Sequence, residues 1–385
     1  MARTIVVLGA SYTGIPVAHY LLKHTAAKVK GGLKVILVSP NTDMYWCIAV
    51  VRGVVPDLMP DNRIFYPIAP AFAKYPAEQF EFIQGKAEGL DPKANTVVVR
   101  RNDGSQLTVG YDDVVIATGA SYKEGPPFKG AGSTEETKAA LHDWRKRIKN
   151  AKSIVVAGAG ATGVEVVGEL GEEYSAKGLK EVTLIADGKL PLPTFLNDDV
   201  RQFAKKELEK NKVNVLISSR VTHVTKKGNK TILEINDGEK TITTDLYLPT
   251  FGIVPSSSFL PSEMLDSAGF VKQTPHLRAQ GHKNIYVIGD VGNLQAPRAI
   301  TGEAEVVHVV KVIESDLLGT ADPGEVKIEP KVMFGATLGR SRATGQMGNW
   351  RPWSWLIWFF KGRYLGTDYA QDYVNGLRTV SVKNW

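Results

Sequence analysis

The same pattern of strand, glycine-rich turn, helix and strand occurs twice in this chain of 385 residues. In the first copy, residues 3–9 and 34–39 are β-branched apolar runs separated by a helical segment. Residues 153–158 and 181–186 repeat both runs in the second copy. Apolar runs that end in glycine before a helix are typical of buried parallel strands in βαβ units. An internal repeat of this length predicts two similar nucleotide-binding units.

Each copy also contains a later apolar strand that ends in glycine, at residues 113–119 and 245–252. A further strand at residues 284–290 has no counterpart in the second copy, so we expect it to complete the first unit. We therefore predict an α/β fold with two Rossmann-like dinucleotide-binding domains, the second inserted in the first, and a small C-terminal region. The predicted boundaries are 1–119 with 247–325 for the first domain, 120–246 for the second, and 326–385 for the C-terminal region.

Composition excludes several classes of protein. Hydrophobic residues make up 43% and charged residues 23%, as in ordinary globular proteins. The single cysteine, Cys47, excludes an internal disulfide and a CxxC pair, and the histidines lack metal-ligand spacing. No stretch reaches the 18 apolar residues that a transmembrane helix needs. The first strand begins near Thr4, which predicts a cytoplasmic protein without a signal or transit peptide.

The turn of the second copy is a full GxGxxG motif. Gly158, Gly160 and Gly163 follow a predicted strand, and Ala161 and Thr162 lie where the helix begins. The first glycine permits the tight turn, the second lets the backbone approach a pyrophosphate, and the third lets helix and strand pack closely. Free N–H groups at the helix N-terminus would then bind the phosphates.

The turn of the first copy carries Ser11 where the second glycine would be. Gly9 and Gly14 flank it, with Tyr12 and Thr13 between Ser11 and Gly14. A serine still permits close approach, and its hydroxyl can donate to a phosphate. Taken alone, this turn is equally consistent with an ordinary loop. Beside the second copy, it predicts two dinucleotides meeting in one protein.

The residue after the second strand of such a unit usually accepts hydrogen bonds from ribose hydroxyls. The first unit has Ser39 and Asn41 there instead of an acid. Asn41 is a neutral substitute or a turn residue. In the second unit, Asp187 would favour NADH by repelling a 2′-phosphate, whereas Lys189 argues for NADPH. The choice between the two nucleotides stays open.

The C-terminal region is basic and rich in tryptophan. Residues 326–385 contain nine Lys or Arg and three acids, and hence +6 of the net charge of +7. Four tryptophans fall within residues 350–361. Tryptophan suits a boundary between apolar and aqueous surroundings. Three roles are open for this run: packing as core, peripheral contact with a membrane, or lining the entry for an apolar substrate. Nucleic acid is disfavoured, because the basic residues are spread out and no binding motif accompanies them.

With Ala117, Thr118 and Gly119 between the two turns, and residues 250–252 and 288–290 after them, the chain resembles flavoproteins with two dinucleotide domains. It is most similar to the apoptosis-inducing-factor-like branch that includes ferroptosis suppressor proteins. Local matches are residues 48–52, 82–87 and 338–346. The resemblance implies FAD in the first domain and NADH or NADPH as hydride donor in the second.

The resemblance also implies roles for individual residues. Arg52 would hold the FAD pyrophosphate side, Ala87 would meet adenine through its backbone, and Asp290 would accept from the ribitol hydroxyls. The implied FAD contacts are Gly9, Ser11, Tyr12, Thr13, Gly14, Ser39, Asn41, Arg52, Ala87, Ala117, Thr118, Gly119, Gly289 and Asp290. The implied contacts to the nicotinamide nucleotide are Gly158, Gly160, Ala161, Thr162, Gly163, Asp187 and Gly252.

Two residues are implied to be catalytic. Glu165 would face the nicotinamide and the flavin, and Lys361 matches a lysine near the flavin in the branch, where its charge would stabilise the reduced ring. The plain alternatives are an exposed helical acid and a solvated surface lysine. Tyr364 and Gly366 flank the place where the branch has an aromatic residue after this lysine. Met1 is followed by Ala2, so the glycine needed for myristoylation is missing.

The expected function is an FAD-dependent NAD(P)H oxidoreductase of the quinone reductase type. Its acceptor would be quinone-like, with dioxygen or another small molecule as alternatives. Two other readings are a flavoenzyme that tailors a small metabolite and a cell-death effector with incidental turnover. The sequence predicts neither a metal site nor an oligomeric state.

Overall fold

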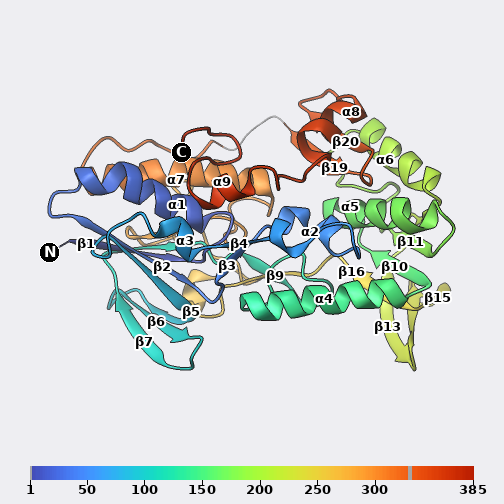
Figure 1. Cartoon of the computed structure of the whole chain (residues 1–385), viewed down its shortest axis with the longest axis horizontal. Helices are drawn as coiled ribbons and strands as arrows, with labels where there is room; N and C mark the ends of the chain where they lie inside the picture. The colour runs from blue at the N-terminus through green and yellow to red at the C-terminus, as the bar shows by residue number, and fades with distance from the viewer. Residues whose placement is uncertain (1, 328–331) are drawn as a thin grey trace.

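A computed structural model describes residues 2–327 and 332–385 and places the two predicted units in two separate sheets (Figure 1). The first sheet has the order β18-β8-β1-β2-β5-β6-β7. Its first five strands run parallel, and β6 and β7 extend it in antiparallel fashion. The strands are β1 (Arg3–Leu8), β2 (Leu33–Ser39), β5 (Phe80–Asp91), β6 (Thr96–Arg101), β7 (Gln106–Gly110), β8 (Asp113–Ile116) and β18 (Ile285–Val287). The pairing of β18 with β8 confirms that residues after the inserted unit complete the first one.

The second unit is a parallel sheet of order β12-β11-β10-β16 with an antiparallel three-stranded sheet beside it. Its strands are β10 (Ser153–Ala157), β11 (Glu181–Ile185), β12 (Asn214–Leu216), β13 (Val221–Lys227), β14 (Lys230–Ile235), β15 (Lys240–Thr244) and β16 (Leu246–Pro249). One domain boundary needs correction. The predicted division between 246 and 247 cuts β16, which pairs with β10 and therefore belongs to the second unit.

The helices cover the faces of the sheets. In the first unit they are α1 (Gly14–Tyr20), continued by η1 (Leu21–Thr25) and η2 (Ala26–Lys28), and α7 (Ala299–Leu318). Figure 1 shows α1 and α7 on the same face of the sheet, and the two helices are in contact. In the second unit they are α4 (Thr134–Asn150), α5 (Ala161–Leu170), continued by η5 (Gly171–Ser175), and α6 (Asp198–Lys210). The sequence did not predict α7, because it follows the last recognisable motif.

Two short strands join the units. β9 (Ala120–Tyr122) leaves the first unit, and β17 (Ile253–Pro255) returns to it as the antiparallel partner of β9. The chain therefore crosses between the units as a two-stranded ribbon, as expected for an insertion. The segment after β2 contains short elements only. They are β3 (Asp43–Tyr45), η3 (Cys47–Ala49), α2 (Val50–Gly53), η4 (Asp61–Arg63), β4 (Phe65–Pro67) and α3 (Ala69–Phe72).

The C-terminal region bridges the two units. It contains the hairpin β19 (Met333–Thr337) and β20 (Ala343–Met347), then α8 (Ser354–Ile357), η7 (Trp358–Gly362) and α9 (Ala370–Val374). The hairpin packs on α5 and α6, whereas α9 packs on α1 and β4 (Figure 1). Because one segment contacts both units, it can bring their residues into one site.

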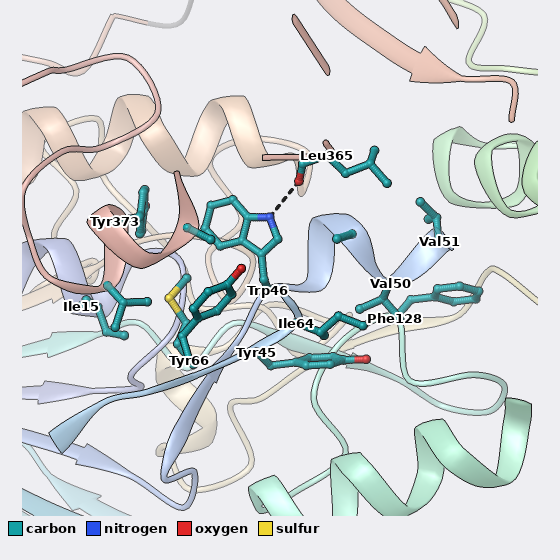
Figure 2. Packing of buried hydrophobic residues seen from close by; sticks show 14 of the residues in the cluster. Ile15, Tyr45, Trp46, Val50, Val51, Ile64, Tyr66, Phe128, Leu365 and Tyr373 are labelled. Atoms are coloured by element: carbon teal, nitrogen blue, oxygen red, sulfur yellow. Dashed lines mark hydrogen bonds between the residues drawn. The ribbon is translucent and has the colours of Figure 1, made fainter. Parts of the chain in front are cut away.

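The core of the first unit includes the end of the chain. The indole of Trp46 is fully buried, and its Nε1 donates to the carbonyl of Leu365 at 2.8 Å (Figure 2). Tyr373 lies edge-on to Trp46 in the same cluster. Trp385 is also buried, and its Nε1 donates to Pro16 at 2.8 Å. Among the helices that the structure describes, we find none with the length and apolarity to span a bilayer.

Candidate functional site

The two glycine-rich turns have the same geometry. Gly9 and Gly158 adopt positive φ angles of 107° and 100°. A Cβ on Gly14 would lie 1.8 Å from the carbonyl oxygen of Gly9, and a Cβ on Gly163 would lie 1.8 Å from that of Gly158. No side chain fits at that distance, so the third glycine of each turn is required by backbone packing. The repeat seen in the sequence is therefore a repeat in structure.

The middle position of each turn has room for a ligand. A Cβ on Gly160 would meet nothing within 4 Å, and Ser11 is exposed. Ala161 and Thr162 begin α5, so backbone N–H groups lie beside this space. In the first turn, the carbonyl of Tyr12 accepts a hydrogen bond from the hydroxyl of Tyr373 at 2.5 Å. Open space beside helix N-termini fits two dinucleotide pyrophosphates.

The ends of β8 and β16, which follow the two turns in the chain, have similar hydrogen bonds. In the first unit, Thr118 donates through its hydroxyl to Ser256 at 2.7 Å, and Gly119 has a φ of 67°. In the second, Thr250 donates to the carbonyl of Gly158 at 2.8 Å, and Gly252 has a φ of 81°. These hydroxyls hold the ends of β8 and β16 against neighbouring backbone. Ala117 continues this edge, with its N–H donating to Leu8 at 2.8 Å.

The residues predicted near the two adenosine moieties lie at strand ends. Ser39 is buried, and its hydroxyl accepts from the N–H of Asn41 at 3.2 Å. Ala87 lies in β5 beside a bulge, and Asp187 is exposed after β11. A cavity of about 350 Å³ opens at residues 81–84 and 101–103, beside the end of β2. The adenosine contacts themselves stay predictions.

Asp290 forms an ion pair with Lys129. Lys129 comes from the segment between β9 and α4, and no motif in the sequence singled it out. Burial lowers the pKa of Lys129, but the charge and hydrogen bond of Asp290, together with Cys47 and Tyr122, outweigh burial and raise that pKa above its usual value. The neighbouring Gly289 donates its N–H to Glu305 at 2.6 Å, and burial raises the pKa of Glu305 to about 7.

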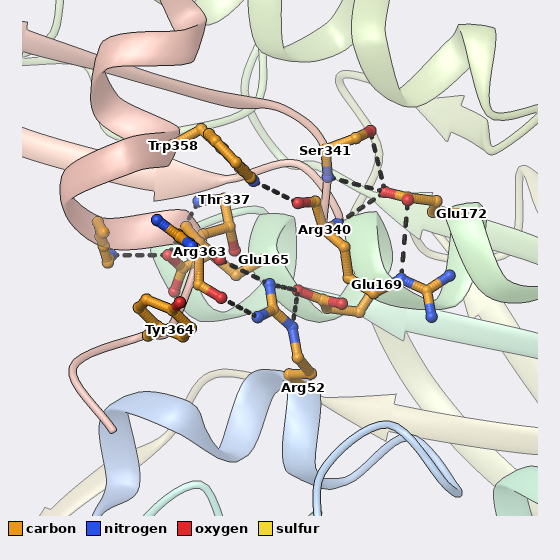
Figure 3. A network of polar contacts seen from close by, with 12 residues as sticks. Arg52, Glu165, Glu169, Glu172, Thr337, Arg340, Ser341, Trp358, Arg363 and Tyr364 are labelled. Carbon is orange, nitrogen blue, oxygen red and sulfur yellow. Dashed lines mark hydrogen bonds and ion pairs between the residues drawn. The ribbon is translucent and has the colours of Figure 1, made fainter. Parts of the chain in front are cut away.

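Glu165 and Lys361, the two predicted catalytic residues, are in direct contact. Lys361 Nζ donates to Glu165 Oε1 at 2.7 Å and to the carbonyl of Gly335 at 2.6 Å. The same carboxylate oxygen accepts from the N–H of Thr337 at 3.0 Å, and Glu165 is 6% exposed (Figure 3). The alternative of an exposed helical acid is therefore wrong. The contribution of β19 through Gly335 and Thr337 was missed, because backbone groups leave no sequence signal.

Arg52 lies on α2 and pairs with Glu169, which comes one helical turn after Glu165 on α5. Its Nε and Nη2 donate to Glu169 Oε1 at 3.0 and 2.8 Å, and Nη2 and Nη1 donate to the carbonyls of Gly362 and Arg363 at 2.9 and 3.3 Å (Figure 3). Burial raises the pKa of Glu169, and the charge of Arg52 opposes that rise. All three guanidinium nitrogens are engaged within the protein, so this geometry gives no support to the predicted FAD contact of Arg52.

The basic charge of the C-terminal region faces the acids of the second unit. Ion pairs join Arg340 to Glu173 at 2.8 Å and Arg351 to Asp199 at 3.1 Å. The hairpin also approaches α5 closely, because a Cβ on Gly168 would lie 2.6 Å from the backbone nitrogen of Gly339. Part of the basic charge that stood out in the sequence thus pairs with acids of the second unit.

The side chains that we call the aromatic surface are exposed rather than packed as core. They are Trp350, Trp353, Trp355, Phe359 and Phe360, with exposed fractions from 51% to 76%. The rings contact one another: Trp353 stacks on Trp355 at 6.3 Å between centroids. For these residues the core interpretation is wrong. Contiguous exposed apolar side chains mark a site for an apolar ligand, a membrane or a partner.

Comparison with known proteins shows the family of the chain. The family described as pyridine nucleotide-disulphide oxidoreductase matches residues 3–309, and the chain belongs to it. The oxidoreductase ptaL of Pestalotiopsis fici is 38% identical over 359 residues, which cover 92% of this chain and 94% of that one. Ferroptosis suppressor protein 1 of Xenopus tropicalis is 25% identical over an alignment that covers 94% of this chain and 90% of that one.

A solved structure is similar over nearly the whole length. The sulfide:quinone oxidoreductase of Aquifex aeolicus superposes with a TM-score of 0.76 at 18% identity, covering 97% of this chain and 92% of that one. The protein is thus an α/β oxidoreductase of this family, a flavoprotein that binds FAD and NAD(P)H. The resemblance to the apoptosis-inducing-factor-like branch is confirmed.

Proposed function

We propose that this protein transfers hydride from NADH or NADPH to FAD and passes the electrons to an apolar, quinone-like acceptor. The observation that carries the proposal is the Lys361–Glu165 ion pair at the start of α5. When bound, FAD accepts hydride from the nicotinamide and releases electrons to a second substrate. The residues of this chain bind and align the two nucleotides and tune the electron exchange electrostatically.

Glu165 is a carboxylate held in one orientation. The N–H of Thr337 and the ammonium of Lys361 both donate to its Oε1, which fixes the side chain two residues after the GxGxxG turn. A fixed carboxylate there can orient the nicotinamide end of a nucleotide whose pyrophosphate lies at the turn. Alignment of reacting groups is worth about 7–11 kcal/mol in well-oriented systems.

Lys361 supplies a positive charge whose position is set by two bonds. Glu165 and the carbonyl of Gly335 hold the ammonium, and its side chain is 33% exposed. A preorganised cation favours the state of the site that carries more negative charge. Because Lys361 borders both the protein interior and solvent, it can act where an incoming acceptor meets the site.

The aromatic surface supports an apolar acceptor. Phe359 and Phe360 directly precede Lys361 in η7, so the exposed rings and the ammonium share one short segment. A flat apolar ring binds favourably against exposed aromatic faces. The structural relative named above is by its title a sulfide:quinone oxidoreductase, so quinones are the first acceptors to test.

We further propose that the aromatic surface contacts a membrane peripherally. Trp350, Trp353 and Trp355 present amphipathic rings outward, a composition that suits the boundary between headgroups and acyl chains. Contact with a bilayer would deliver an apolar acceptor at the place where electrons leave.

A metabolite-tailoring reaction is the second candidate. The relative with 38% identity is named an oxidoreductase of a filamentous fungus, and it matches this chain more closely than the ferroptosis suppressor protein does. The acceptor would then be a specific small molecule, again apolar enough to bind the aromatic surface.

Anaerobic reduction followed by an acceptor survey tests the proposal. NADH should bleach the 450 nm flavin band of the purified yellow protein, and short-chain quinones should restore it faster than air does. Absence of bleaching by either nucleotide would refute the oxidoreductase. Bleaching without reoxidation by any quinone would favour the tailoring enzyme.

A further inference from the structure

Arg52 connects three segments that are distant in sequence. It projects from α2 of the first unit, pairs with Glu169 on α5 of the second, and donates to Gly362 and Arg363 of the C-terminal region. Arg52 is 6% exposed and Glu169 is 1% exposed. The two carbonyls immediately follow Lys361.

These hydrogen bonds hold the backbone that follows Lys361. Its ammonium is held at one end by Glu165 and Gly335. Its backbone is held at the other end by Arg52 through the next two residues. Glu165, which binds Lys361, and Glu169, which binds Arg52, lie four residues apart on α5, so both contacts are made to the same helix.

We propose that Arg52 is a positioning residue for Lys361. Its rigid, planar guanidinium bonds one carboxylate and two carbonyls at once, which a lysine ammonium cannot match in geometry. The FAD-bearing unit thereby sets the backbone from which Lys361 reaches α5. This inference rests on the proposed function for its kinetic consequence, and its effect on the Lys361 side chain can be measured separately.

Removal of Arg52 alone would leave Glu169 buried without a partner, and such a variant can unfold. The test variant is therefore Arg52→Met combined with Glu169→Leu, since replacing both partners of a buried pair by apolar groups is often tolerated. Arg52→Lys is the conservative variant. Arg145→Met is the matched control, because Arg145 donates to the carbonyl of Gly53 at 2.7 Å, beside Arg52, without touching the C-terminal region.

The first measurement is amine labelling by a water-soluble acylating reagent, read by peptide mass spectrometry on the FAD-loaded protein. We expect Lys361 to react at least fivefold faster in the double variant and at an intermediate rate in Arg52→Lys. Lys230, paired with Asp245 in the second unit, should react as in wild type and serves as the internal reference. Arg145→Met should leave Lys361 labelling unchanged.

The second measurement is anaerobic flavin reduction under single-turnover conditions. At saturating NADH, the double variant should reduce flavin at least tenfold more slowly, with the Kd for NADH within twofold of wild type. A folded double variant with wild-type labelling of Lys361 would overturn the positioning role. Failure of the wild-type protein to be reduced would refute the proposed function instead, and the labelling result would still decide the role of Arg52.

Discussion

Lys361 Nζ lies 2.7 Å from Glu165 Oε1, although the two residues are 196 positions apart in the chain. One belongs to the C-terminal region and the other to the nucleotide helix α5, so the contact exists only when the two have docked. A buried, oriented carboxylate with a partly exposed ammonium can discriminate between charge states of bound cofactors.

The first prediction concerns this pair. Lys361→Met should slow flavin reduction or its reoxidation by quinone by about 10²-fold, the usual effect of losing one preorganised electrostatic group. Stopped-flow spectroscopy of each half-reaction measures the effect. Lys230→Met removes a lysine paired with Asp245 in the second unit and should have no effect. Unchanged rates in both half-reactions would show that Lys361 is only structural.

The second prediction concerns Asp290 and Lys129. Asp290→Ala should weaken FAD binding by about 10–100-fold, because a charged acceptor of hydrogen bonds is lost. Lys129→Met should weaken it less, through the orientation of Asp290. The ratio of absorbance at 450 nm to that at 280 nm after dialysis gives the flavin content. Asp322→Asn, on the surface, is the control, and full flavin retention in Asp290→Ala would contradict the predicted contact.

A third prediction addresses the choice of nucleotide. Asp187→Ser should shift the ratio of kcat/KM values by about tenfold towards NADPH, since a carboxylate repels a 2′-phosphate. Lys189→Ser should shift the ratio the other way. Steady-state rates with both nucleotides measure the shift. Identical ratios in all three proteins would place the ribose elsewhere.

The fourth prediction is a pH dependence of stability. Burial lowers the pKa of His19 to about 3, and its ring nitrogens contact Tyr75 and Val374. The unfolded chain binds a proton near pH 6.5 and the folded protein does not, so stability falls as the pH drops from 6.5 towards 3. From pH 7 to pH 5, the wild-type protein should lose about 2 kcal/mol more than His19→Gln.

Urea unfolding of both proteins at the two pH values measures that difference. Gln can donate to the carbonyl of Val374 and accept from Tyr75, so the variant keeps both bonds. An equal pH dependence in the two proteins would mean that His19 is protonated in the folded state.

The fifth prediction tests the membrane contact. Trp353→Ser with Phe360→Ser should reduce co-flotation with phosphatidylcholine vesicles at least tenfold, because burial of each ring contributes about 1.5–3 kcal/mol. Leu179→Ser, an exposed apolar residue outside the aromatic surface, is the control. Flotation of the double variant at the wild-type level would refute the contact.

The repeated turns were predictable because their chemistry is local. Gly14 and Gly163 are required by contacts within their own turns, and such constraints leave a fixed spacing in the sequence. The return of β18 to the first sheet was predictable for a different reason, because a strand without a counterpart in the second unit needs a partner in the first. The resemblance and not the spacing singled out Glu165 and Lys361, and their contact with each other was not predicted.

Other parts of the site could not be read from the sequence. Lys129 meets Asp290 through tertiary packing, and Gly335 and Thr337 contribute backbone atoms. Whether the tryptophans are buried or exposed depends on which face of α8 and η7 the hairpin covers. The resemblance assigned Arg52 to FAD, whereas in the structure Arg52 pairs with the buried Glu169.

The insertion of one unit within the other has a consequence for biosynthesis. A ribosome completes β10 to β16 as one continuous stretch while β8 of the first sheet still lacks its neighbour β18. The inserted unit can therefore fold before the unit that encloses it, and the nascent chain exposes an open strand edge during that interval. We expect chaperone demand during translation to be concentrated between synthesis of residues 116 and 287.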